Sequence, residues 1–145
     1  MTKETHDLSF LAGGSAALYE KKLFTLLRYS LAFVFVWFGV LKIAGFNPVF
    51  DLINAVMPLA ASGPGFIALG VVETLIGMGL FLNRARFFIH SLLLLHLSGT
   101  FLTFIVGTDI VFVPYFPVLS LAGEFVVKNL VLAVSGLVVL AHERP

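Results

Sequence analysis

The sequence predicts an all-α integral membrane protein in which four transmembrane helices form one bundle. Hydrophobic residues make up 59% of the 145 residues and charged residues only 12%, whereas a soluble domain is about half apolar and about a quarter charged. The mean hydropathy of +1.05 agrees with this. Long apolar segments also recur along the chain, and a helix needs about 20 such residues to cross a hydrocarbon core of about 30 Å.

The apolar segments set the expected limits of the spans. We expect transmembrane helices at about residues 26–46, 65–82, 87–106 and 121–141. Together they form a single membrane domain over residues 26–141. The expected tails cover residues 1–25 and 142–145.

Basic residues collect on one side of these spans. They flank the start of the first helix, the turn between the second and third, and the end of the fourth: Lys21, Lys22, Arg28, Arg84, Arg86 and Arg144. The connections after the first and third helices carry Asp51 and Asp109 instead. Because short cytoplasmic loops are enriched in Lys and Arg, both termini are expected to be cytoplasmic.

The connection between the first and second helices, residues 47–64, is too apolar to extend into water. Asn47 is a typical helix cap and Pro48 a typical first helical residue. Pro58 then stops a helix that reaches Met57. The pattern predicts a short interfacial helix here. The later connection, "GTDIVFVPYFPVLSLAG", carries two prolines among aromatic residues and predicts a second apolar lid on the same side.

Glu73 is the most informative ionisable residue within the spans. It lies about eight residues from the outer end of its helix, roughly 12 Å of helical rise, which is too deep for a glutamate to reach water. Gly70 and Gly77 share its face, so a neighbouring helix can approach closely there. Glu73 is either a neutral residue that hydrogen-bonds a neighbouring helix or a ligand-binding or proton-linked carboxylate.

Lys42 lies roughly 6 Å of helical rise from the outer end of the first helix. By itself it would be interpreted as a lysine that extends to the membrane surface. Glu73 needs a partner at a similar height, however, because an unpaired charge in lipid is very costly. We therefore expect Lys42 to point inward toward Glu73.

Three further ionisable residues are candidates. Glu124 and Lys128 are four residues apart, which allows an ion pair on one helix, but Lys128 is also deep enough to join Glu73. His96, in the middle of the third helix, is either a packing residue or a ligand-binding one. Such charges are cheaper together than alone, so they are expected to converge below the lids, either structurally or around an anionic or quinone-like head group. The glycines expected at helix contacts are Gly39, Gly70, Gly77 and Gly99.

Several chemistries are excluded or not indicated. The chain has no cysteine, which excludes thiol–disulfide catalysis and thiolate metal sites. His90 and His96 are six residues apart and face different directions, so no metal site is predicted. Nothing resembles a nucleic-acid-binding patch. A redox role would depend on a bound quinone, another bound cofactor or a partner subunit.

The motifs resemble those of YkgB-like proteins in the wider DoxX-like superfamily. "LLRYSLAFVFVWFGVLKI" is similar to the family's first helix, with its W-x-G-x-L-K ending, and "GPGFIALGVVETLIGMGLFL" to its second, a glycine-rich helix around one Glu. "TFLTFIV" and "LSLAGEFVVKNLVLAVSGLVVL" are similar to the third and fourth. Glu124 and Asn129 depart from the family's pattern of an Arg and an Asp. By position, the polar pattern of the family falls on Arg28, Gly39, Lys42, Glu73, Gly123 and Lys128.

This resemblance implies a multi-pass protein of a prokaryotic cytoplasmic (inner) membrane. Relatives are linked to resistance against reactive chlorine and other oxidants, or are subunits of quinone-linked oxidoreductases. The first hypothesis is therefore a redox or oxidative-stress accessory protein with a pocket for quinone or a small anion, supplied with electrons by a partner subunit. The second is a structural or assembly subunit of a larger complex. The third is a small proton-linked transporter, which a homo-oligomer would have to form because the chain has no inverted repeat.

Overall fold

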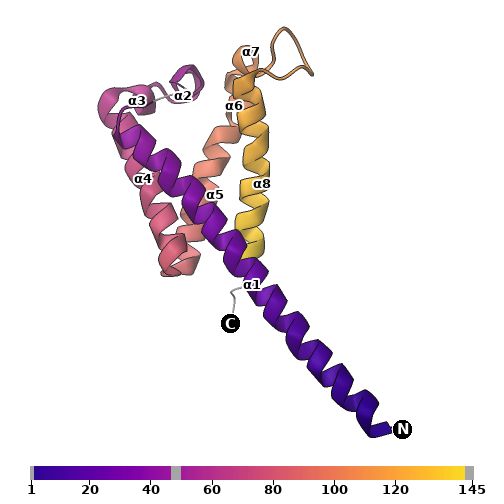
Figure 1. Ribbon diagram of the computed structural model, residues 1–145. Coiled ribbons are helices and arrows are strands. Elements are labelled where there is room, and N and C mark those ends of the chain that lie inside the picture. The colour runs from indigo at the N-terminus through magenta and orange to yellow at the C-terminus, as the bar shows by residue number, and fades with distance from the viewer. Residues whose placement is uncertain (1, 47–49, 143–145) are drawn as a thin grey trace.

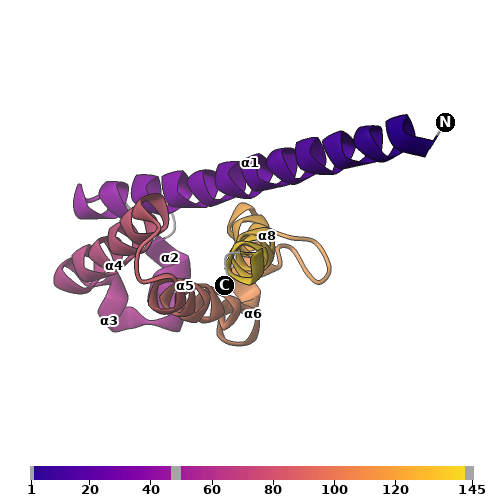
Figure 2. The ribbon, with the colours of Figure 1, turned by 90° about the horizontal axis from the view of Figure 1, so that it is seen from below.

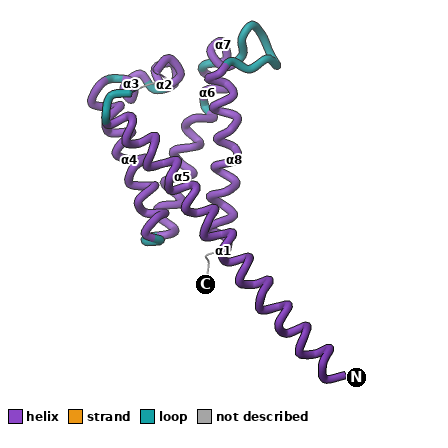
Figure 3. The backbone as a smooth tube through the Cα atoms, viewed as in Figure 1, coloured by secondary structure: helices purple, strands orange, loops and turns teal. Residues whose placement is uncertain are grey.

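The structure is a computed structural model that describes residues 2–46 and 50–142. The long helices are α1 (Thr2–Ile43), α4 (Gly63–Leu82), α5 (Arg86–Phe101) and α8 (Leu121–His142). Four short helices connect them: α2 (Phe50–Val56), α3 (Pro58–Ala61), α6 (Thr103–Val106) and α7 (Thr108–Val111). No β-strand occurs in these ranges (Figure 3). Four segments are long and apolar enough to cross a membrane, so the prediction of an all-helical chain with four candidate spans is confirmed.

Helix α1 is much longer than expected, because it includes most of the segment expected to be a tail. The N-terminal part of α1 extends away from the other helices (Figure 1). No proline interrupts residues 2–46, and an interior glycine costs a helix only about 1 kcal/mol, so Gly13 and Gly14 do not break it. The helix ends at Ile43 rather than Phe46. Gly45 stops it with φ of 86°, a left-handed conformation in which a Cβ would be strained.

Short helices beyond those expected occur in two places. The third span breaks at Leu102, between α5 and α6. The hydroxyls of Thr100 and Thr103 each bond a backbone carbonyl three residues earlier, a local bond that bends helices. The expected short helix before Pro58 is present as α2, and a second short helix, α3, begins at Pro58 because proline fits a first helical turn. The expected cap of α2 at Asn47 and Pro48 lies outside the described residues.

The long helices form two arms. Helix α1 packs along α4, and α5 packs along α8. The arms meet where a tight turn joins α4 to α5 and separate toward the other end, where α2, α3, α6 and α7 lie (Figure 1). We call these the turn end and the lid end. Viewed from below, α4, α5 and α8 all lie on one side of α1 (Figure 2).

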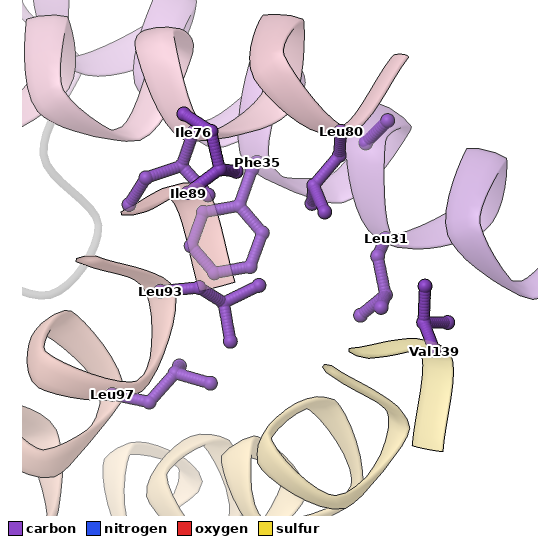
Figure 4. Close-up of a cluster of buried hydrophobic side chains, with 9 residues drawn as sticks. Leu31, Phe35, Ile76, Leu80, Ile89, Leu93, Leu97 and Val139 are labelled. Atoms are coloured by element: carbon purple, nitrogen blue, oxygen red, sulfur yellow. The ribbon is translucent and has the colours of Figure 1, made fainter. Parts of the chain in front are cut away.

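The turn end contains the main hydrophobic core (Figure 4). Its buried residues come from all four long helices: Leu31, Ala32, Phe35, Ile76, Leu80, Ile89, Leu93, Leu97 and Val139. Arg28 of α1 closes this end, since its Nη1 donates to the carbonyl oxygens of Leu80 and Phe81 at 2.5 and 3.3 Å. These are among the last carbonyls of α4, where the regular bonding of a helix ends; the Leu80 oxygen also accepts from the backbone N–H of Asn83 at 3.3 Å.

A second, smaller cluster holds the lid end together. Leu52 of α2 is buried with Val111 and Val126, and aromatic side chains of α5 and α6 pack around them. Helix α2 lies in the connection between α1 and α4, and Val126 belongs to α8. The cluster therefore connects the two arms across the gap between them. The space between the arms is thus covered by α2 and closed below by the main core.

Candidate functional site

The expected contact between Lys42 and Glu73 is present. Nζ of Lys42 donates to Oε2 of Glu73 at 2.7 Å, and both residues are buried. Glycines allow this approach: a Cβ on Gly70 would lie 2.8 Å from Cβ of Lys42 and 2.7 Å from the carbonyl oxygen of Gly39. Both distances are too short for any side chain, so α1 and α4 can touch at this level only through glycine.

His96 joins this pair from the opposite arm. Its Nε2 lies 3.0 Å from Oε1 of Glu73, so each carboxylate oxygen has one partner. The imidazole packs edge-on against Phe35, and the Lys42 ammonium lies 5.7 Å from the centre of the Phe38 ring. Lys42, Glu73 and His96, which we call the polar triad, therefore come from three helices, α1, α4 and α5.

The polar triad lies on the wall of a cavity of about 620 Å³ between the arms. Helix α2 covers it through Leu52, Ile53 and Val56. The remaining lining is mostly aliphatic and aromatic. The polar residues on its wall are Lys42, Glu73, His96, Ser98, Thr100, Thr103 and Asn129. Met57, Leu95 and Leu102 line it and are also exposed, so the cavity opens on an apolar part of the surface.

Lys128 and Glu124 do not reach the triad, and the expectation that Lys128 flanks Glu73 is wrong. The two residues pair with each other at 3.4 Å, with side chains 73% and 52% exposed. The buried face of α8 consists of residues three or seven apart: Gly123, Val126, Asn129, Gly136 and Val139. Neighbouring helical residues differ by about 100°, so the face that presents Asn129 to the cavity turns Lys128 away from it.

The glycines behave in two ways. Gly39 and Gly77, like Gly70, lie at close helix contacts, since a Cβ on Gly77 would be 2.7 Å from the backbone nitrogen of Val36. The expectation that Gly99 also packs against a helix is wrong, because a Cβ there would meet nothing within 4 Å. Gly99 instead lines the cavity. Its missing side chain leaves space that no other group fills.

Asn129 is the cavity residue that sequence reasoning did not select. It is 5% exposed, and its Nδ2 donates to Oγ1 of Thr100 at 3.1 Å. The signal available in the sequence was the spacing of small and apolar residues on α8, which places Asn129 on the same face as Gly123 and Val126. Lys128, the ionisable residue one position earlier, instead favoured the neighbouring face as the one that reaches Glu73.

The described part of the chain contains no group of three or more His, Cys, Asp or Glu side chains that could hold a metal ion. No protein-family model, curated protein or solved structure matches this chain. The likeness to YkgB-like proteins thus rests on the motifs alone, and the site must be interpreted from its own chemistry.

Proposed function

We propose that this protein binds a membrane quinone or its quinol and serves as an accessory component of membrane redox chemistry. The observation that carries the proposal is the position of the polar triad. Three polar side chains, two of them buried and the third 13% exposed, are in contact with one another on the wall of a mostly apolar cavity of about 620 Å³. Ligand pockets of about 300–1,000 Å³ with a few convergent polar groups are typical of small-molecule sites.

The charge of the triad favours a neutral head group over an anionic one. The ammonium of Lys42 and the carboxylate of Glu73 offset each other at 2.7 Å. A buried anion would compete with Glu73 for the single lysine and leave a negative charge uncompensated, which is costly in an apolar medium. A quinone brings no charge and so avoids this cost.

The hydrogen-bonding capacity of the triad suits both redox states of the ligand. Lys42 has three N–H groups and uses one on Glu73, so another can donate to a quinone carbonyl. A neutral His96 that donates from Nε2 to Glu73 leaves Nδ1 as an acceptor, which can receive the hydroxyl of a quinol. Glu73 holds both neighbours in place.

The rim of the cavity suits a ligand that arrives from the lipid. Met57, Leu95 and Leu102 are exposed there and carry no polar group. A prenyl tail can therefore remain in contact with apolar side chains while the head group reaches the triad. Because the chain has no cysteine, electrons would pass to or from the ligand through a partner subunit, in agreement with the resemblance to DoxX-like proteins.

A binding experiment tests the proposal. The full chain is reconstituted into quinone-free nanodiscs and titrated with a short-chain quinone, with thermal stability as the readout, since a ligand at about 100 times its Kd stabilises a protein by about 2.7 kcal/mol. We expect saturable stabilisation. It should be lost in Lys42→Met/Glu73→Leu, a double variant that removes both charges together and leaves neither one unpaired.

The exposed pair provides a matched control. Glu124→Leu/Lys128→Met removes the same two charges from α8, away from the cavity, and should bind quinone as the unmodified protein does. Absence of saturable binding to the unmodified protein, or an equal loss in both double variants, would exclude the polar triad as a quinone site.

A further inference from the structure

A second polar group faces the same cavity, on the arm opposite Lys42. Asn129 is more than nine-tenths buried and lines the cavity together with Thr100. The hydroxyl of Thr100 donates its only hydrogen to the carbonyl oxygen of Leu97 at 2.7 Å. Oγ1 of Thr100 therefore accepts from Asn129, which fixes Nδ2 as the group that points to it.

This orientation leaves hydrogen-bonding capacity on the Asn129 amide. The second N–H of Nδ2 and both lone pairs of Oδ1 have no partner among the described residues. Buried amide groups are almost always hydrogen-bonded. The Asn129 amide lies on the cavity wall, so a molecule that enters the cavity can bond this unused donor and acceptor capacity.

Helix α5 contacts both this group and the polar triad. His96 belongs to the triad, and Thr100, which holds Asn129, is four residues later on the same helical face. The two positions are separated by about 6 Å of helical rise. Gly99 lies between them and borders the cavity, with open space where its Cβ would be. A six-membered ring with an oxygen at each end has a comparable length.

We infer that the cavity recognises a ring with oxygens at opposite ends, as in a 1,4-quinone or 1,4-quinol. One oxygen bonds Lys42 or His96, the ring lies beside Gly99, and the second oxygen bonds Asn129. Both ends offer a donor and an acceptor, so each redox state is held at both oxygens. This inference rests on the proposed function and makes it specific, because a lipid with a single polar head would use only the triad.

A comparison of two ligands tests the second contact. A short-chain 1,4-quinone and a 4-alkylphenol with a similar tail, which lacks the second oxygen, are each titrated against the reconstituted protein. Asn129→Leu should weaken quinone binding by about tenfold, the loss expected for one hydrogen bond, and leave phenol binding unchanged. Thr100→Val, which keeps the shape of the side chain but removes the hydroxyl that orients Asn129, should weaken only the quinone.

Gly99→Leu provides an independent variant. It should weaken both ligands by filling the space between the polar ends, and its Cβ meets no atom within 4 Å. The two-ended site would be overturned if Asn129→Leu and Thr100→Val left quinone binding unchanged, or if these two variants weakened quinone and phenol binding equally. Either result would leave the quinone proposal standing. Failure of the unmodified protein to bind quinone would overturn both.

Discussion

Nζ of Lys42 and Oε2 of Glu73 lie 2.7 Å apart, with side chains only 9% and 7% exposed. Neither residue is adjacent to water in the way that a surface ion pair is, so each provides most of the compensation for the charge of the other. Helices α1 and α4, which carry them, also make the most extensive helix contact of the described structure. The pair thus belongs both to the main helix contact of the fold and to the candidate site.

Removing one partner should be far worse than removing both. Glu73→Leu leaves the Lys42 ammonium buried without its carboxylate, and loss of one partner of a buried pair costs about 3–5 kcal/mol. Adding Lys42→Met should recover most of this loss, because no charge then remains buried. Unfolding in detergent, followed by circular dichroism, measures the difference.

The exposed pair on α8 gives the matched comparison for that experiment. Glu124→Leu should change stability by only about 0–1 kcal/mol, as for a surface ion pair, because both side chains are more than half exposed. If Glu73→Leu is no more destabilising than Glu124→Leu, then the Lys42–Glu73 contact is not the buried pair described above.

Substitution by alanine should change protein stability in opposite directions at Gly77 and at Gly99. Gly77→Ala should destabilise by about 1–3 kcal/mol, the cost of overpacking, because the new Cβ would lie 2.7 Å from the Val36 nitrogen and 2.8 Å from the Ala32 carbonyl oxygen. Gly99→Ala meets no atom within 4 Å and should stabilise by about 0.5–1 kcal/mol through helix propensity. Thermal unfolding of both variants under identical conditions shows the sign; two changes in the same direction would contradict the distinction.

Arg28 should be required for stability at the turn end. Arg28→Met keeps much of the apolar stem but removes the hydrogen bonds to the carbonyl oxygens of Leu80 and Phe81. Hydrogen bonds from a charged group contribute about 1.5–3 kcal/mol, so a loss of that size is expected in unfolding experiments. Ligand affinity should be retained, because Arg28 does not line the cavity. Stability equal to that of the unmodified protein would show that these carbonyls do not need Arg28.

Leu52 should control the lid. Leu52→Ala removes a buried side chain from the cluster that joins α2 to Val111 and Val126, and such truncations cost about 2–5 kcal/mol when the site cannot collapse. Hydrogen exchange should accelerate in residues 50–56, while the core around Leu93 at the other end remains protected. Leu59→Ala, at a position of α3 that is 84% exposed, is the control. Uniform acceleration along the chain would argue against a separately held lid.

The sequence by itself determined the all-helical class and the four segments that are long and apolar enough to cross a membrane. Length and apolar composition decide whether a segment crosses a bilayer, and the four expected segments correspond to four apolar helices. Glu73 was recognisable as a residue in need of a partner because depth depends only on position along a helix. The proximity of Lys42 followed from the same reasoning, since both lie at similar heights and the glycines mark a close contact.

Only the tertiary structure decided which face of each helix points inward. A shift of one residue turns a side chain by about 100°, and this rotation separates Asn129, which lines the cavity, from Lys128, which is exposed. The rotation of each helix also decides that Gly77 packs against a neighbouring helix and that Gly99 borders the cavity. His96 meets Glu73 because two arms joined at the turn end bring α5 opposite α4. The packing of side chains far apart in the sequence fixes these rotations; the spacing on α8 indicates one shared face for Asn129 and Gly123, but not what that face contacts.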